Sequence, residues 1–285
     1  MHKVKFWALT SLLLTVLACA HHNEGPLFVT APVQMNTAAS NSAPVAMLVH
    51  GLNTRPDKMK ALADVLTSMG YVTQITQLSG DANQADWPAV SLSIWHQEML
   101  QAYRDLVTNR QPRQILFVGF SLGAALGTEL LSSEASVHFD KMILLAPAIS
   151  VHGYTRLVRI FGFWGSLSIP SASPAEYRQH SGTSEDAYGA LFDAIDNLSV
   201  LQTSQQDKLS VPTLVMTDPD DELVSQVGLK DWVQTNQLRH WDLQSVSNQG
   251  STLTRPYHHL IIDAVCVGEA EWLRMKTQIG KFLNP

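Results

Sequence analysis

The chain has 285 residues, of which 45% are hydrophobic and 15% are charged, and its formal net charge is −6. This balance excludes intrinsic disorder, which needs low hydrophobicity and high net charge. Two cysteines are too few for a disulfide scaffold. The acidic balance, without any run of basic residues, excludes nucleic acid as a main partner.

Residues 1–20 have the pattern of a secretory signal peptide. Two lysines precede the apolar run Phe6–Ala18, which is too short to span a bilayer core of about 30 Å. Cleavage after Ala20 is one processing route; the other follows a resemblance of residues 16–19 to a bacterial lipobox, which would lipidate Cys19. We favour the lipoprotein. The expected location is the bacterial cell envelope, with a periplasmic or secreted protein as the alternative.

Residues 21–44 carry few regular signals and contain a polar, small-residue stretch that is typical of a spacer. A short edge strand around Leu27–Val33 could interrupt this segment.

From Val45 onward, apolar strand-like runs alternate with segments of helical spacing. Strands are predicted at 45–49, 71–78, 114–119, 141–145, 211–217 and 240–246, and helices at 57–69, 88–107, 122–131, 224–235 and 269–282. Buried strands alternating with amphipathic helices predict an α/β fold, in which a mostly parallel sheet has helices on both faces. The predicted core comprises residues 45–147 and 211–285.

The interval 148–210 interrupts this alternation and is far longer than an ordinary connection between a strand and a helix. We predict that it is an insertion of two or three helices forming a cap. Its segment 157–167 is rich in large apolar residues, which could accept an acyl chain, touch a membrane surface or simply pack on the core.

The strand at 114–118 runs directly into Gly119-Phe120-Ser121-Leu122-Gly123, a G-x-S-x-G motif followed by a helix. In that context the motif indicates a tight turn that lifts the serine hydroxyl above the sheet, with glycines removing side chains that would clash. Ser121 is therefore the predicted nucleophile.

Acyl transfer also needs hydrogen-bond donors for the oxyanion of the tetrahedral intermediate. The backbone N–H of Leu122, directly after the nucleophile, is one expected donor. The other is the N–H of Leu52, in the loop after the first predicted strand. His50 is expected to hold that loop through its ring nitrogens.

A serine nucleophile needs a base and an acid that orients the base, in the chain order Ser, acid, His. The strand at 211–217 is followed by four acids, Asp218, Asp220, Asp221 and Glu222. We select Asp221, three residues before Val224, with Asp220 and then Asp218 as alternatives. The unselected acids are expected to be solvated or to cap the next helix.

Two adjacent histidines follow the last predicted strand, where the base is expected. We select His258 because it stands five residues before Asp263, like the H-V-x-T-x-D run of related lipases, and keep His259 as the alternative. Asp263 is expected to start a helix.

With these motifs and the runs Leu48–Gly51 and Leu145–Ala148 in place, residues 45–283 resemble the α/β-hydrolase superfamily. The chain looks closest to monoacylglycerol lipases, lysophospholipases and carboxylesterases with a helical cap. The resemblance implies an eight-stranded, mostly parallel sheet and ester hydrolysis without a metal or organic cofactor. The chain departs from the pattern at the doubled histidine and at Thr217, where relatives often have glycine.

The expected activity is hydrolysis of a carboxylic ester, such as an acylglycerol or lysophospholipid, through a Ser-His-Asp triad and an acyl-enzyme. The expected partners are this acyl ester and a membrane surface, reached through lipidated Cys19 or the apolar cap. One alternative is an aminopeptidase of the same fold, for which Glu176, Glu185 and Asp186 could bind a substrate amine. The other is a non-catalytic binding lipoprotein on a hydrolase scaffold.

Overall fold

A computed structural model of the chain describes residues 42–80, 90–108, 110–153, 155, 169–255 and 257–284. The predicted signal peptide, Cys19, nearly all of the spacer and the apolar segment 157–167 lie outside these residues, so the assignments made for them remain predictions. In the part of the chain that is described, no helix is both long enough and apolar enough to cross a bilayer.

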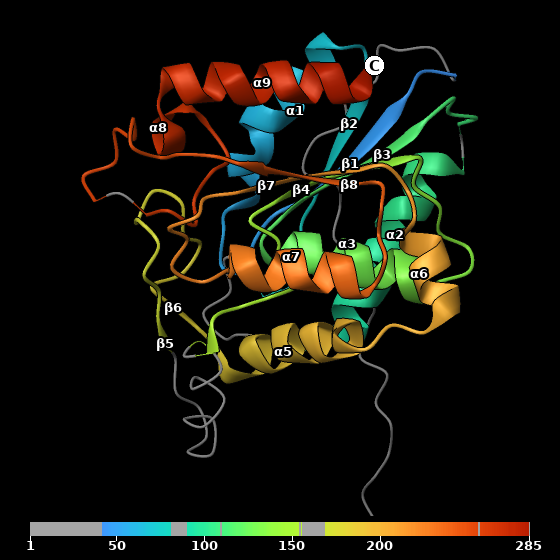
Figure 1. Cartoon of the computed structure of the whole chain (residues 1–285), viewed down its shortest axis with the longest axis horizontal. Helices are drawn as coiled ribbons and strands as arrows, with labels where there is room; N and C mark the ends of the chain where they lie inside the picture. Colours follow the sequence, from blue (N-terminus) through green and yellow to red (C-terminus); the bar gives the residue numbers. More distant parts are fainter. Residues whose placement is uncertain are drawn as a thin grey trace, which may run out of the picture.

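A six-stranded, entirely parallel sheet forms the centre of the described structure, in the order β2-β1-β3-β4-β7-β8 (Figure 1). The strands are β1 (Val45–Val49), β2 (Val72–Thr76), β3 (Ile115–Phe120), β4 (Lys141–Leu145), β7 (Thr213–Thr217) and β8 (Trp241–Ser245). The predicted parallel sheet is confirmed. Six strands are described rather than the eight that the resemblance implied, and the predicted edge strand at 27–33 lies outside the described residues.

Helices cover both faces of this sheet (Figure 1). The central strands are buried on both sides, since Met47 packs into one hydrophobic cluster and its neighbour Leu48 into the other. The first cluster holds the apolar faces of α2 (Leu92–Val107), α3 (Leu122–Ser133) and α7 (Gln226–Thr235). The second holds those of α1 (Lys60–Ser68) and α9 (Glu269–Leu283). This three-layer arrangement confirms the predicted α/β class.

The helix boundaries agree closely with the hydrophobic periodicity. A 3-10 turn, η1 (Pro56–Met59), precedes α1, which ends before Gly70, where φ is +91°. The short helix α8 (Ala264–Val267) was not predicted as an element. Asp263 starts it as expected, because its side chain accepts a hydrogen bond from the N–H of Cys266.

The interval between β4 and β7 contains two described helices, α5 (Glu185–Ser199) and α6 (Thr203–Leu209). They follow the short antiparallel pair of β5 (Ile169–Pro170) and β6 (Gly182–Thr183). The buried face of α5 belongs to the same hydrophobic cluster as α2 and α3. The described part of this interval therefore packs onto the body as an outer layer, seen at the bottom of Figure 1.

Candidate active site

The turn from β3 into α3 holds Ser121 in a strained backbone conformation. Its φ is 52° and its ψ is −114°, values that a residue with a side chain rarely adopts and that cost about 1–3 kcal/mol. Gly119 and Gly123 must be glycines, because neighbouring backbone atoms lie too close to them for a side chain to fit. A Cβ at Gly119 would lie 2.5 Å from the Cα of Ala124, and one at Gly123 would lie 2.4 Å from the carbonyl oxygen of Val49. The predicted tight turn is thus present.

His259 lies between Ser121 and Asp221. Its Nε2 is 2.8 Å from the Ser121 hydroxyl oxygen, and its Nδ1 is 2.9 Å from Oδ2 of Asp221. Because the carboxylate can only accept, Nδ1–H donates to Asp221 and leaves Nε2 free to accept from the serine hydroxyl. The three side chains come from three separate turns at the carboxyl ends of the parallel strands.

Asp221 is buried and fully hydrogen-bonded. Besides the imidazole, its Oδ1 accepts the N–H groups of Leu223 at 2.7 Å and Val224 at 2.8 Å. Burial alone would raise the pKa of the Asp221 carboxyl. The adjacent His259 and these N–H groups outweigh it and hold the pKa below its ordinary value. Asp221 is therefore an ionised acceptor, and neither Asp218 nor Asp220 contacts His259 in this way.

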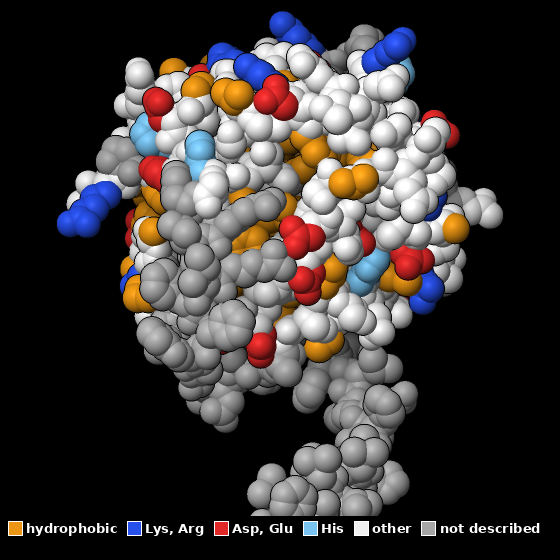
Figure 2. Space-filling view, turned by 60° about the horizontal axis from the view of Figure 1, so that its bottom comes forward, with side chains coloured by type: hydrophobic (Ala, Val, Ile, Leu, Met, Phe, Trp, Pro, Cys, Tyr) orange, Lys and Arg blue, Asp and Glu red, His pale blue; other side chains and the backbone are white. Residues whose placement is uncertain are grey.

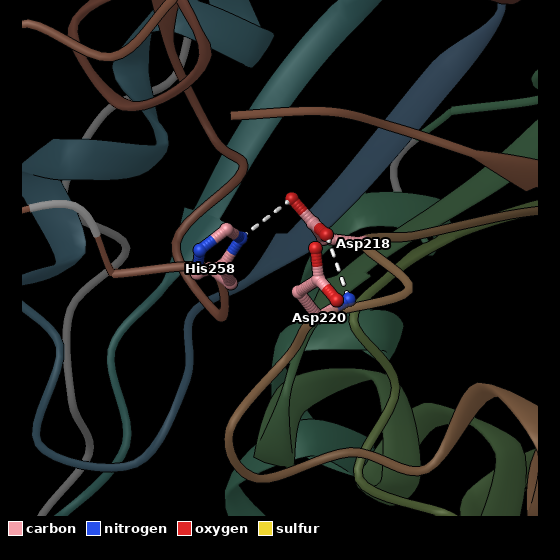
Figure 3. A group of neighbouring side chains, drawn as sticks. All are labelled: Asp218, Asp220 and His258. Atoms are coloured by element: carbon pink, nitrogen blue, oxygen red, sulfur yellow. Dashed lines mark hydrogen bonds and ion pairs between the residues drawn. The ribbon is translucent and has the colours of Figure 1, made fainter. Parts of the chain in front are cut away.

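The structure does not bring His258, the histidine selected as the base, to Ser121. The Nδ1 of His258 faces Oδ2 of Asp218 at 3.1 Å, not Ser121 (Figure 3). Partial burial lowers the pKa of His258, but the hydrogen bond and charge of Asp218, with Glu222 and Asp220 nearby, raise it overall. Spacing from Asp263 could not decide between the two histidines, because the turn of the loop sets which ring faces Ser121.

Asp218, Asp220 and His258 bring three potential metal-ligating atoms within 4.8 Å of one another (Figure 3). The Asp218 carboxylate already has protein donors on both oxygens: the Asp220 N–H on Oδ1, and the Asn248 N–H and the His258 ring on Oδ2. This network accounts for the buried Asp218 by itself, and we interpret it as a connection between two loops.

The unselected acids therefore do not all behave as predicted. Asp218 is buried and pairs with His258, and Glu222 accepts backbone N–H groups from the histidine loop; only Asp220 is exposed. None of them caps α7, because Ser225 does so by accepting the N–H of Gly228.

The two predicted oxyanion donors lie on adjacent segments. Leu122 is the first residue of α3, where a backbone N–H has no partner within the helix. Leu52 follows β1, and the close approach of Gly123 to the carbonyl oxygens of Val49 and His50 sets this loop against the first turn of α3.

Asn53, which the sequence reasoning did not single out, ties the Leu52 loop to the segment before β6. Its amide donates to the carbonyl oxygens of His180 at 3.0 Å and Gly182 at 3.3 Å, and its Oδ1 accepts the His180 N–H at 2.7 Å. It is buried, with φ at 53°, a conformation that asparagine tolerates better than most residues. The position of Asn53 directly after Leu52, an expected oxyanion donor, is the sequence signal that could have identified it.

His50 holds the loop after β1 as predicted, with Nδ1–H donating to the carbonyl of Gly51 and Nε2 accepting the N–H of Leu78. Complete burial lowers the pKa of this imidazole to about 4, although the Gly51 bond opposes the shift. The folded protein therefore keeps His50 neutral at a pH where the unfolded chain protonates it.

We expect this difference to make the free energy of unfolding depend on pH. The contribution is complete above the unfolded pKa of 6.5 and is lost as the pH falls towards the folded pKa of about 4. Between pH 7 and pH 5 the loss is about 2 kcal/mol. Urea unfolding at pH 7 and at pH 5 checks this expectation: the free energy of unfolding of the wild type should fall by about 2 kcal/mol more than that of His50→Gln. Equal losses would contradict the buried neutral imidazole.

The same fold occurs in known proteins. A structure described for LipS and LipT, two metagenome-derived lipolytic enzymes, matches with a TM-score of 0.66 at 16% identity, covering 87% of this chain and 96% of the other. Monoglyceride lipase from Saccharomyces cerevisiae matches with a TM-score of 0.64 at 14% identity, covering 88% and 90%. A search of curated protein sequences gave no match.

The strand order, the strained serine turn and these likenesses define the class of the protein, which is an α/β-hydrolase fold. The family model described as "serine aminopeptidase, S33" matches residues 40–197, more than half of the chain. The chain belongs to this family of α/β-hydrolases.

Proposed function

We propose that the protein is a serine hydrolase that cleaves carboxylic esters through an acyl-enzyme, with Ser121 as nucleophile, His259 as base and Asp221 as the orienting acid. The observation that carries the proposal is the continuous Ser121–His259–Asp221 hydrogen-bond chain, with contacts of 2.8 Å and 2.9 Å. Nucleophile, base and orienting acid in mutual reach are what acyl transfer requires.

In the proposed mechanism, Oγ of Ser121 attacks the acyl carbon while its proton passes to Nε2 of His259. The N–H groups of Leu52 and Leu122 bind the oxyanion. As the C–O bond to the alcohol breaks, the imidazolium returns that proton to the leaving oxygen. A water, deprotonated by the same Nε2, then attacks the acyl-enzyme, and the carboxylic acid leaves as Ser121 regains its proton. Asp221 remains ionised and stabilises the imidazolium throughout.

A lipid-like acyl chain is the substrate class that the surface favours. On the face carrying α5 and the β5–β6 pair, hydrophobic side chains gather in a hollow (Figure 2). The similar structures include, besides the yeast enzyme, a monoacylglycerol lipase from Paleococcus ferrophilus, with a TM-score of 0.62 at 13% identity, covering 85% of this chain and 96% of the other. An apolar hollow favours an acyl chain over a charged group.

Peptide hydrolysis is the second candidate function, and the description of the family favours it. An aminopeptidase needs a carboxylate to bind the substrate amine. Glu176 and Asp186 are exposed, and Glu185 and Asp186 lie in the first turn of α5, where acids stabilise a helix without any ligand. Glu185 and Asp186 are therefore explained by their place at the start of α5, Glu176 is an exposed surface acid, and we favour the ester.

Initial rates on nitrophenyl esters from acetate to laurate, beside aminoacyl-naphthylamides, test the proposal. We expect kcat/KM to rise with chain length by up to about fourfold per methylene, the value of about 0.8 kcal/mol for each buried CH₂. The aminoacyl amides should stay near the background of the Ser121→Ala variant. Cleavage restricted to acetate would contradict the lipid-like substrate, and turnover of the amides alone would favour the aminopeptidase.

A further inference from the structure

Two loops meet around His259. They are joined by more contacts than the single one between Asp221 and His259 that a triad needs. We call residues 218–222 the acid loop and residues 257–260 the base loop. The acid loop contacts the ring of His258 through Asp218 and the ring of His259 through Asp221. Its last residue, Glu222, contacts the backbone of the base loop.

The Glu222 carboxylate binds two consecutive backbone N–H groups. Its Oε1 accepts the N–H of His258 at 3.1 Å, and its Oε2 accepts the N–H of His259 at 3.0 Å. Charge-assisted hydrogen bonds of this kind are roughly twice as strong as neutral ones. Because both oxygens are used, the carboxylate fixes the direction of the peptide unit that carries the His259 side chain.

From these contacts we propose that Glu222 is a positioning residue for His259, holding the base loop by its backbone so that the imidazole stays between Ser121 and Asp221. The inference rests on the proposed function. It explains why an acid directly follows Asp221: one carboxylate orients the ring and the next fixes the backbone. Glu222 acts through the backbone of the base loop, to which its two bonds are made.

Glu222 is the side chain that binds the backbone N–H of His259, within a turn that the Leu260 N–H closes by donating to the Tyr257 carbonyl. The ring of His259 faces Ser121, Asp221, Phe120 and Tyr257, and of these only Asp221 brings a charge. The aromatic rings lie 5.3 Å and 6.0 Å away between centroids and restrict the imidazole sideways. They do not hold the main chain, to which the Glu222 bond is made.

The Glu222→Gln variant tests this with the shape of the side chain preserved. A glutamine can accept only one of the two N–H groups, and its amide would face the other, donor against donor. We expect kcat on a nitrophenyl ester to fall between about 10-fold and about 100-fold, the effect of a misplacement of about 1 Å, with KM little changed.

Each rate is divided by the number of competent sites, counted by titration with a fluorophosphonate, so that partial unfolding does not imitate the effect. Asp220→Asn is the matched control, because it removes one charge from the same loop at an exposed position without contacts to His259. Glu222→Asp, shorter by one methylene, provides a second variant and should fall between wild type and Glu222→Gln.

An active wild type together with a Glu222→Gln variant of unchanged kcat would overturn the positioning role. Equal losses in Asp220→Asn and Glu222→Gln would also overturn it, since the loss would then follow from charge alone. A wild type that reacts with neither ester nor fluorophosphonate would instead overturn the proposed function, so the two failures are distinguishable.

Discussion

Replacing His259 with alanine is expected to lower kcat on a nitrophenyl ester by at least about 10⁴-fold, whereas His258→Ala should lower it by less than about tenfold. The two histidines are adjacent in the sequence, but their rings point in different directions. His259 reaches both Ser121 and Asp221, while His258 contacts Asp218. Steady-state rates of both variants, compared with wild type, measure the difference directly.

Thermal unfolding of both variants serves as the control. His258→Ala removes a ring whose side chain is 28% exposed and leaves the buried Asp218 without one of its donors, so this variant should be measurably less stable yet remain active. The reverse ranking of activities, with His258→Ala inactive and His259→Ala active, would contradict the site described above and restore the choice made from spacing.

Ser121→Ala is expected to have the second large effect, a loss of about 10⁴-fold to 10⁶-fold in kcat with the fold intact. Alanine keeps the size of the residue and removes only the hydroxyl that bonds to Nε2 of His259. The free energy of unfolding should therefore change by no more than about 1.5 kcal/mol, the usual value of one hydrogen bond. Rates and urea unfolding of the same preparation check both parts, and a substantially active variant would contradict the assignment of the nucleophile.

Much of the fold was predictable because its signals are local. The run Val45–Val49 is buried at all five positions, as a continuous apolar strand should be in a sheet covered on both faces. The position of Ser121 was predictable for a similar reason, since only glycines at 119 and 123 permit the close contacts of the turn.

The choice between His258 and His259 was not predictable from spacing. The two residues share the same loop, and which ring faces Ser121 depends on contacts with Asp218, Asp221 and Glu222, which lie 36 to 40 positions earlier in the chain. For the same reason, the unselected acids after β7 were expected to be solvated or to cap the next helix, although two of them, Asp218 and Glu222, bind the base loop.

The interval 148–210 shows a further limit of what can be predicted from the sequence. Its length predicted an insertion with helices of its own, and α5 and α6 are present, but length does not say against which surface an apolar face packs. Contacts such as Asn53 with His180 connect segments 127 positions apart. They depend on tertiary arrangement, to which neither residue gives a strong local signal.

Covalent labelling with a fluorophosphonate, followed by mass spectrometry of the digested protein, tests the central claim most directly. A serine activated by His259 should react stoichiometrically, and the adduct should be found on the peptide containing Ser121. Labelling should be absent in Ser121→Ala and strongly slowed in His259→Ala. A folded wild type that remains unlabelled, or an adduct on a residue other than Ser121, would contradict the claim and favour a binding protein on a hydrolase scaffold.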